Sequence, residues 1–121
     1  MYGGVISDSV GLNGVTVNDK ATFNMYGGEI SHNTDYGVEI FAGGTFNMRG
    51  GVIKYDTNPA SYDRIGVFCR GGDFNMYGGV ISGCGRGVHV TCRDSDPIIP
   101  GEFTMTGGTI KENEVGVSLF S

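Results

Sequence analysis

Two carboxylates are the strongest candidates in this sequence for catalytic residues. Asp73 and Glu102 stand immediately before equivalent copies of a repeated motif, so stacked repeats would place them in one column. The two carboxyl groups would then lie about 5 Å apart, a separation that suits a retaining glycosidase. The alternative is a pair of solvated carboxylates at the starts of two strands. The sequence offers no better catalytic candidates, and it favours a protein without enzymatic activity.

An aromatic and amide surface is the candidate binding site. The residue after each motif methionine points outward, and a second outward column, made of amides, runs beside it. Aromatic rings and amides can bind sugars by stacking and hydrogen bonding. The same side chains can instead form ladders that stabilise the face of a sheet. Both interpretations stay open for Tyr2, Tyr26, Arg49, Tyr77, Asn24, Asn47 and Asn75.

No metal or cofactor site is predicted. His32 and His89 lack the partner spacing of a zinc site, and the acidic run at residues 94–96 lacks the further oxygen ligands that calcium needs. Glu39 shares an outward column with His89, but Phe68 stands between them. That separation, about 10 Å, is too long for direct proton exchange.

The candidates are positioned by an eight-residue motif that recurs along the chain. Its first full copy is FNMYGGEI at residues 23–30, and further copies follow at 46–53, 74–81 and 103–110. A shortened copy opens the chain. The motif methionines are separated by 24, 23, 28 and 29 residues, a period that indicates a repeat architecture.

A second landmark, Gly-Val followed by alternating variable and apolar residues, occurs once in each repeat. The alternation is typical of β-strands, and no stretch has the 3.6-residue apolar spacing of a helix. Each repeat therefore supplies three short strands. We predict one all-β domain, residues 1–121, folded as a right-handed parallel β-helix solenoid of about five coils. Columns of Phe, Met, Ile and Val would fill its interior.

The phrases FNMYGGVIS, at residues 74–82, and GGTFNM, at residues 43–48, resemble repeats of bacterial surface and secreted proteins with a pectin-lyase-like right-handed β-helix. The resemblance covers essentially the whole chain. It implies the fold and a parent protein on the surface of a bacterium or outside the cell. Because that superfamily includes polysaccharide lyases, glycoside hydrolases, phage tailspikes, adhesins and passive stalks, the resemblance implies no single activity.

The composition of the chain excludes some classes of binding partner. Asp and Glu number 13 against 8 Lys and Arg, and the net charge of −5 argues against a nucleic-acid partner, because phosphate contacts need a basic patch. No run is long and apolar enough for membrane insertion, and Met1 already lies inside a repeat, so we expect no signal peptide in this chain. Three cysteines leave at least one thiol free or paired between chains. We expect Cys69, Cys84 and Cys92 to be free buried thiols, and a Cys84–Cys92 bridge stays open as the alternative.

Two repeats contain insertions, and the repeat array has no visible capping unit at either end. Residues 54–65 and 91–102 lengthen two repeats and are expected to be surface loops. Neither end shows a capping unit, so we expect end-to-end stacking between chains, or further coils of a longer parent chain. The sequence favours a non-catalytic structural or adhesive segment of a bacterial surface protein. The alternative is a carbohydrate-active module that binds or cleaves a polysaccharide on the Tyr/Asn face or beside Asp73 and Glu102.

Overall fold

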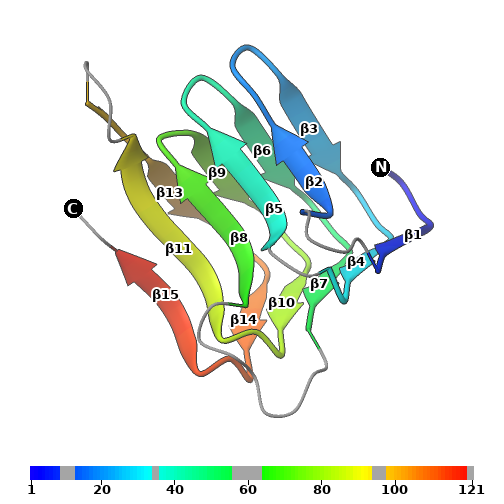
Figure 1. Ribbon diagram of the computed structural model, residues 1–121. Helices are drawn as coiled ribbons and strands as arrows, with labels where there is room; N and C mark the ends of the chain where they lie inside the picture. The colour runs from blue at the N-terminus through cyan, green and yellow to red at the C-terminus, as the bar shows by residue number, and fades with distance from the viewer. Residues whose placement is uncertain (9–12, 34–35, 56–63, 94–97, 120–121) are drawn as a thin grey trace.

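The protein is all-β. The structure is a computed structural model that describes residues 1–8, 13–33, 36–55, 64–93 and 98–119. Every helix or strand within these ranges is a β-strand, and the strands form three sheets (Figure 1). The predicted all-β class with parallel pairing between repeats is therefore confirmed.

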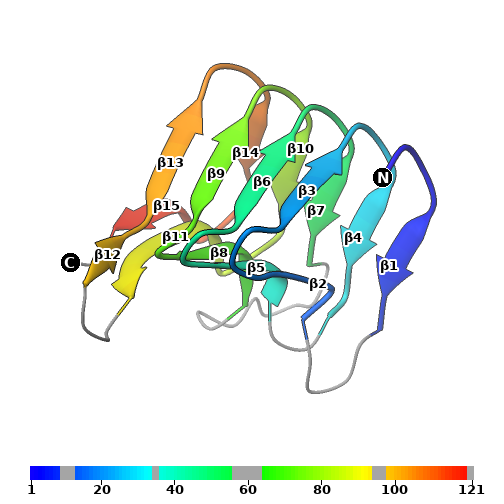
Figure 2. The same ribbon diagram turned by 90° about the horizontal axis from the view of Figure 1, so that it is seen from above.

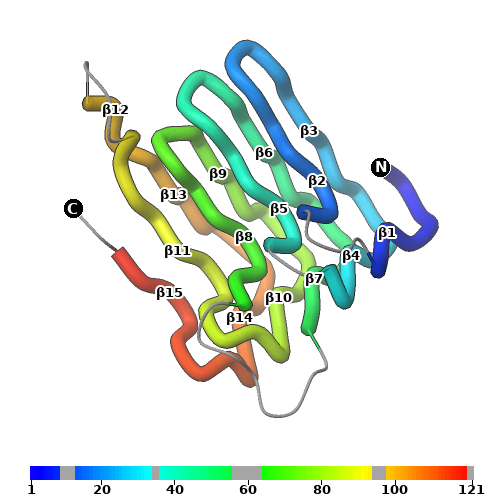
Figure 3. The backbone as a smooth tube through the Cα atoms, viewed as in Figure 1, coloured from blue at the N-terminus to red at the C-terminus, as the bar shows by residue number. Residues whose placement is uncertain are grey.

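Each repeat adds at most one parallel strand to each of the three sheets. In spatial order, the first sheet contains β1 (Val5–Ser7), β4 (Glu29–Ser31), β7 (Val52–Lys54), β10 (Val80–Ser82) and β14 (Thr109–Lys111). The parallel strands of the second are β2 (Val15–Val17), β5 (Tyr36–Phe41), β8 (Ile65–Arg70), β11 (Arg86–Arg93) and β15 (Val115–Leu119), and the short β12 (Ile99–Pro100) pairs with β11 at its edge. The third contains β3 (Thr22–Met25), β6 (Thr45–Met48), β9 (Asp73–Met76) and β13 (Glu102–Met105). Figure 2 and the tube in Figure 3 show the chain visiting the three sheets in turn.

Equivalent residues of successive repeats pair directly. Phe46 lies opposite Phe74 in the third sheet, and Ile30 lies opposite Ile53 in the first. Repeats of unequal length keep this register, because equivalent residues still pair on both sides of each insertion. The columns of like residues predicted from the sequence are confirmed.

One core joins the inner faces of the three sheets. The methionine column and the inner phenylalanines have no exposed surface where they lie between two other repeats, as at Met48 and Phe74. The phenyl rings stack in a ladder with centroid separations of 4.9 to 5.1 Å. Because each layer repeats the shapes of the one before it, the side chains fit closely. Burial of each large apolar side chain stabilises the fold by about 2 kcal/mol.

The second insertion contains more strand than the sequence predicted. β11 runs on to Arg93, and β12 (Ile99–Pro100) pairs back against it in the antiparallel sense, with Cys92 opposite Pro100. Glu102 already belongs to β13. The predicted loop over residues 91–102 is therefore corrected, because backbone hydrogen bonds between β11 and β12 are a more favourable use of these polar groups than an open loop.

The first insertion is described only at its flanks. Lys54 is the last residue of β7, Tyr55 is buried, and Ile65 is the first residue of β8. The predicted loop over residues 54–65 therefore begins and ends inside strands. Residues 56–63 lie outside the described ranges.

Candidate functional site

The two candidate carboxylates are neighbours. Glu102 in β13 pairs directly with Asp73 in β9, and both residues are exposed. The insertion before Glu102 has therefore not shifted the register. Neighbouring strands lie about 4.8 Å apart, so the pair has the strand separation that the sequence predicted. The same column continues through Thr45 and Thr22, which places the carboxylates on an open sheet face where water weakens their electrostatic effect on a substrate.

The tyrosine column is stacked on itself. The rings of Tyr2 and Tyr26 lie 4.7 Å apart with 9° between their planes. Further along the column, the guanidinium group of Arg49 lies 4.4 Å from the ring centre of Tyr77. Each of these contacts covers one face of a ring, although Tyr2 remains 80% exposed and Tyr77 44% exposed. The column is therefore built as a ladder, and sugar binding, which would stack a ligand on a ring face, stays a prediction.

The asparagine column beside it is a hydrogen-bonded ladder. Asn47 Nδ2 donates to Asn24 Oδ1 at 3.0 Å, and Asn75 Nδ2 donates to Asn47 Oδ1 at 2.9 Å. Each bond joins one repeat to the next. Such bonds contribute about 1 kcal/mol each. The amides that could recognise a sugar thus already bind each other.

A polar row on the outer face of the second sheet is more enclosed than its sequence pattern suggested. Glu39 of β5 is 7% exposed and His89 of β11 is 8% exposed, with Phe68 of β8 between them. The predicted order of these three residues is confirmed. The Glu39 carboxylate accepts a hydrogen bond from Asn13 Nδ2 at 2.8 Å and forms an ion pair with Arg70 at 3.5 Å.

Long side chains lie across this row. The guanidinium group of Arg70 is 4.5 Å from the ring centre of Phe68, and the ring of Tyr36 is 4.8 Å from it. His89 meets the same ring edge-on at 5.1 Å. The alternation of the strand places these positions outward, but it carries no signal for neighbours folding over them. Burial of Glu39 and His89 was therefore missed by the sequence analysis.

His89 and Ser118 bring a base and a hydroxyl group together. Ser118 Oγ lies 2.5 Å from His89 Nδ1. Burial lowers the pKa of His89 below its usual value, and the charges of Arg86 and then Arg70 lower it further. The imidazole is therefore neutral at neutral pH and can accept a proton. However, Arg86 Nη1 lies 3.4 Å from His89 Nε2, whereas a catalytic triad has an acceptor carboxylate at this place.

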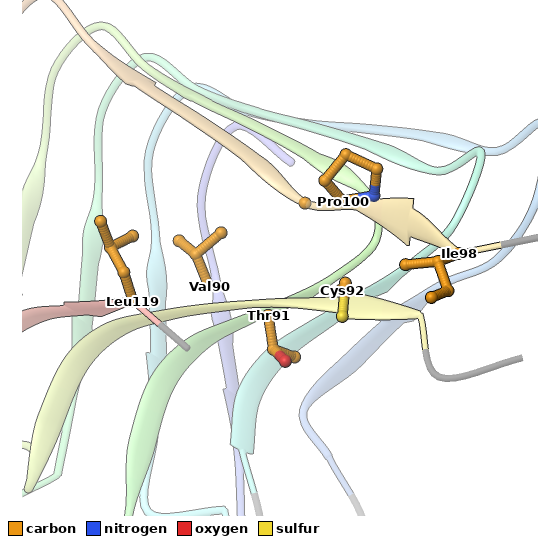
Figure 4. Close-up of a pocket in the computed structure, with 7 residues that line it drawn as sticks. Val90, Thr91, Cys92, Ile98, Pro100 and Leu119 are labelled. Carbon is orange, nitrogen blue, oxygen red and sulfur yellow. The ribbon is translucent and has the colours of Figure 1, made fainter. Parts of the chain in front are cut away.

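An apolar groove of about 510 Å³ opens where the second sheet turns toward the third, at the end of the chain (Figure 4). In Figure 4 the side chains of Val90 and Leu119 lie side by side, with Ile98 and Pro100 across from them. Leu119 is 76% exposed and Ile98 is 70% exposed. The lining is mainly apolar, so the groove suits an apolar contact better than a reaction.

The cysteines are free thiols. Cys69 and Cys84 are buried, and Cys92 is half-buried. The Cys84–Cys92 bridge left open by the sequence is therefore absent. The Cys69 thiol donates to the carbonyl of Gly72 at 2.9 Å, and burial raises its pKa to about 11. A thiol in this state is a structural group, because the thiolate is the reactive form.

Within the described ranges, no three His, Cys, Asp or Glu side chains are placed to hold a metal ion. Asp94 and Asp96, the nearest sequence candidates for calcium, lie outside those ranges. The part of the chain that the structure describes contains no helix of the length and apolarity required to cross a bilayer. No protein family, curated protein or solved structure matches this chain.

Proposed function

We propose that the three sheets are the walls of a right-handed parallel β-helix solenoid of the pectin-lyase-like kind. Its support is the parallel register of every repeat on the next, together with a chain path that visits the sheets in a fixed order. Right-handed connections are the strong default between parallel strands of one sheet. The chain thus behaves as a series of stacked layers in which each repeat contacts its neighbours.

The function of this segment is structural or adhesive, without catalysis. One observation carries this conclusion: the amides and the paired rings of the outward columns contact one another within the column. The amides of Asn24, Asn47 and Asn75 bind each other, and Tyr2 stacks on Tyr26. Ladders of this kind stabilise a surface, and this role of the side chains requires no substrate.

The parent protein belongs on the surface of a bacterium or outside it. This part of the proposal rests on the resemblance of the repeats to those of surface and secreted proteins. The end strands are then completed either by a second copy stacked end to end or by further coils of a parent chain.

Glycan binding and turnover test the role directly. The chain of residues 1–121 would be applied to a glycan array and incubated with a panel of acidic and neutral polysaccharides. The expected result is no retained glycan and no new reducing ends or unsaturated products. Saturable binding that is lost in Tyr77→Ala would instead establish a carbohydrate-binding surface.

A carbohydrate-active enzyme is the second candidate, and one observation favours it. Asp73 and Glu102 are paired directly on neighbouring strands and are both exposed, and the strand spacing of about 4.8 Å is compatible with the carboxyl separation of about 5 Å in retaining glycosidases. Turnover that disappears in Asp73→Asn and in Glu102→Gln, but persists in Asp19→Asn at an exposed turn, would support this candidate. Equal turnover in all three variants would reject it.

A further inference from the structure

We infer that one copy of this chain docks head to tail on a second copy in the register of its own repeats. The N-terminal face, made of Gly3, β1 and β2, meets the C-terminal face, made of β14 and β15. This inference rests on the proposed solenoid and deepens it by naming the partner and the alignment. Within the described residues, each of these four strands pairs with a parallel strand on one side only.

The first argument comes from a column of equivalent glycines, one in each repeat. The space beside each glycine is occupied by a backbone carbonyl of the neighbouring repeat, except at the N-terminal end of the column. At Gly27, Gly50, Gly78 and Gly107, an added Cβ would lie closer than 3.0 Å to a backbone carbonyl of the preceding repeat. Gly3 is the first member of this column, and nothing lies within 4 Å of the same position. In the docked register the missing carbonyl is that of Thr106 in the second copy, since Gly107 meets its equivalent, Tyr77.

A second glycine column makes the same argument in the opposite direction. A Cβ at Gly37, Gly66 or Gly87 would lie 2.6 to 2.7 Å from the carbonyl of the corresponding glycine in the following repeat. Gly116 is the last member, and its nearest neighbour is a side-chain carbon of Ile110 at an ordinary 3.8 Å. The carbonyl that fits there is that of Gly14 in the next copy. The two columns are thus open on opposite faces, and one head-to-tail contact fills both.

The apolar columns are open at the same two faces. Val117 is 43% exposed and Leu119 is 76% exposed, whereas Val67 and Cys69, their equivalents inside the molecule, are fully buried. At the other face Ile6 and Val15 are half-buried, whereas Ile30 and Val38, their equivalents one repeat further in, are fully buried. The docked register places apolar residues opposite one another at Val15 and Val117 and at Ile6 and Ile110.

Among the described residues, charge is compatible with this register except where Asp8 would meet Glu112. The strand residues that would face each other pair a charged group only with a neutral one, as with Ser7 and Lys111. The residues that follow them, Asp8 and Glu112, would meet as two exposed carboxylates, both with left-handed backbone, φ 62° and 58°. This like-charge contact weakens docking slightly and supplies a variant that should strengthen it.

Two alanine substitutions test the inference. Gly3→Ala and Gly116→Ala each add a methyl group where the isolated molecule has room, so urea unfolding of dilute protein should be unchanged. Each should weaken self-association, measured by sedimentation across concentrations, by about tenfold or more, because the methyl group meets a backbone carbonyl at the contact. Gly50→Ala is the matched control, since its methyl group clashes inside the molecule and should lower stability instead.

Mixing the two variants tests the polarity. Gly3→Ala retains an intact C-terminal face and Gly116→Ala retains an intact N-terminal face, so the mixture should form dimers and stop there. Glu112→Gln should tighten association of the parent chain by about twofold. If Gly116→Ala does not fold, Leu119→Asp replaces it, because Leu119 is largely exposed and lies on the same face.

Three results would overturn the inference. They are a parent chain that is monomeric at every concentration, variants that associate as strongly as the parent, and a mixture that forms no heterodimer while each variant pairs with itself. None of these results bears on the absence of glycan turnover, so head-to-tail docking can fail while the non-catalytic role stands.

Discussion

Asn47 is the middle rung of the amide ladder: its Nδ2 donates to Asn24 at 3.0 Å, and its Oδ1 accepts from Asn75 at 2.9 Å. Asn47→Ala therefore removes two hydrogen bonds, and it takes away the acceptor of Asn75 Nδ2 and the donor to Asn24 Oδ1. We expect the free energy of unfolding to fall by about 2 kcal/mol, against about 1 kcal/mol for Asn24→Ala, which removes one bond. Urea unfolding measures both, and equal losses would show that the ladder does not act as described.

Lys20 has a left-handed backbone conformation, and the equivalent positions of the next two repeats are occupied by glycine. Its φ is 66°, and the equivalent residues are Gly43 at 83° and Gly71 at 81°. Left-handed backbone is unfavourable for residues with a Cβ. Lys20→Gly should therefore raise the free energy of unfolding by about 0.5 to 1 kcal/mol. Lys20→Ala keeps the strain and should stay within about 0.5 kcal/mol of the parent; a loss of stability in the glycine variant would contradict the argument.

His89 should make stability depend on pH. Its pKa in the folded protein is lowered from 6.5 by burial and by Arg86 and Arg70, so the unfolded chain binds a proton more readily than the native one. The stability that neutral His89 provides is present above about pH 6.5 and is lost as the pH falls toward the lowered pKa. Between pH 7.5 and 5.5, the urea midpoint of the parent should fall more than that of His89→Gln. Parallel curves for the two proteins would refute this role.

The three thiols should react at different rates. Cys92 is half-buried, whereas Cys69 and Cys84 are buried, and the pKa of Cys69 is about 11. In native protein at pH 8, a thiol reagent should modify Cys92 first, and the other two only at the rate of opening or unfolding. Cys92→Ser should abolish the fast phase. Rapid modification of two or more thiols in that variant would mean that the core is more open than described.

The repeat columns could be predicted because the same residue types recur at equivalent positions. Phe74 has to meet Phe46 and Phe103 if neighbouring layers share one shape, and the structure places them so. The pairing of Asp73 with Glu102 followed from the same reasoning, and the preceding insertion did not disturb it. Spacing alone was sufficient for these contacts, since strand pairing fixes the positions of the Cα atoms.

Side-chain direction on the outer faces could not be predicted in the same way. Glu39 and His89 alternate outward, yet both are buried, because Arg70 reaches over Phe68 and Arg86 reaches His89. Such contacts depend on the rotamers of long side chains, which the strand period does not fix. The antiparallel return of β12 was also missed, since Ile99 and Pro100 carry no alternation long enough to indicate a strand.

The tolerance of the register to insertion has a practical consequence. Extra residues enter between Lys54 and Ile65 without disturbing the pairing of β7 with β10 or of β8 with β11. The connections between the strands can therefore change in length without a change in the three sheets. A foreign peptide grafted at such a connection would be displayed at a defined position across the sheets, set in steps of about 4.8 Å by the choice of repeat.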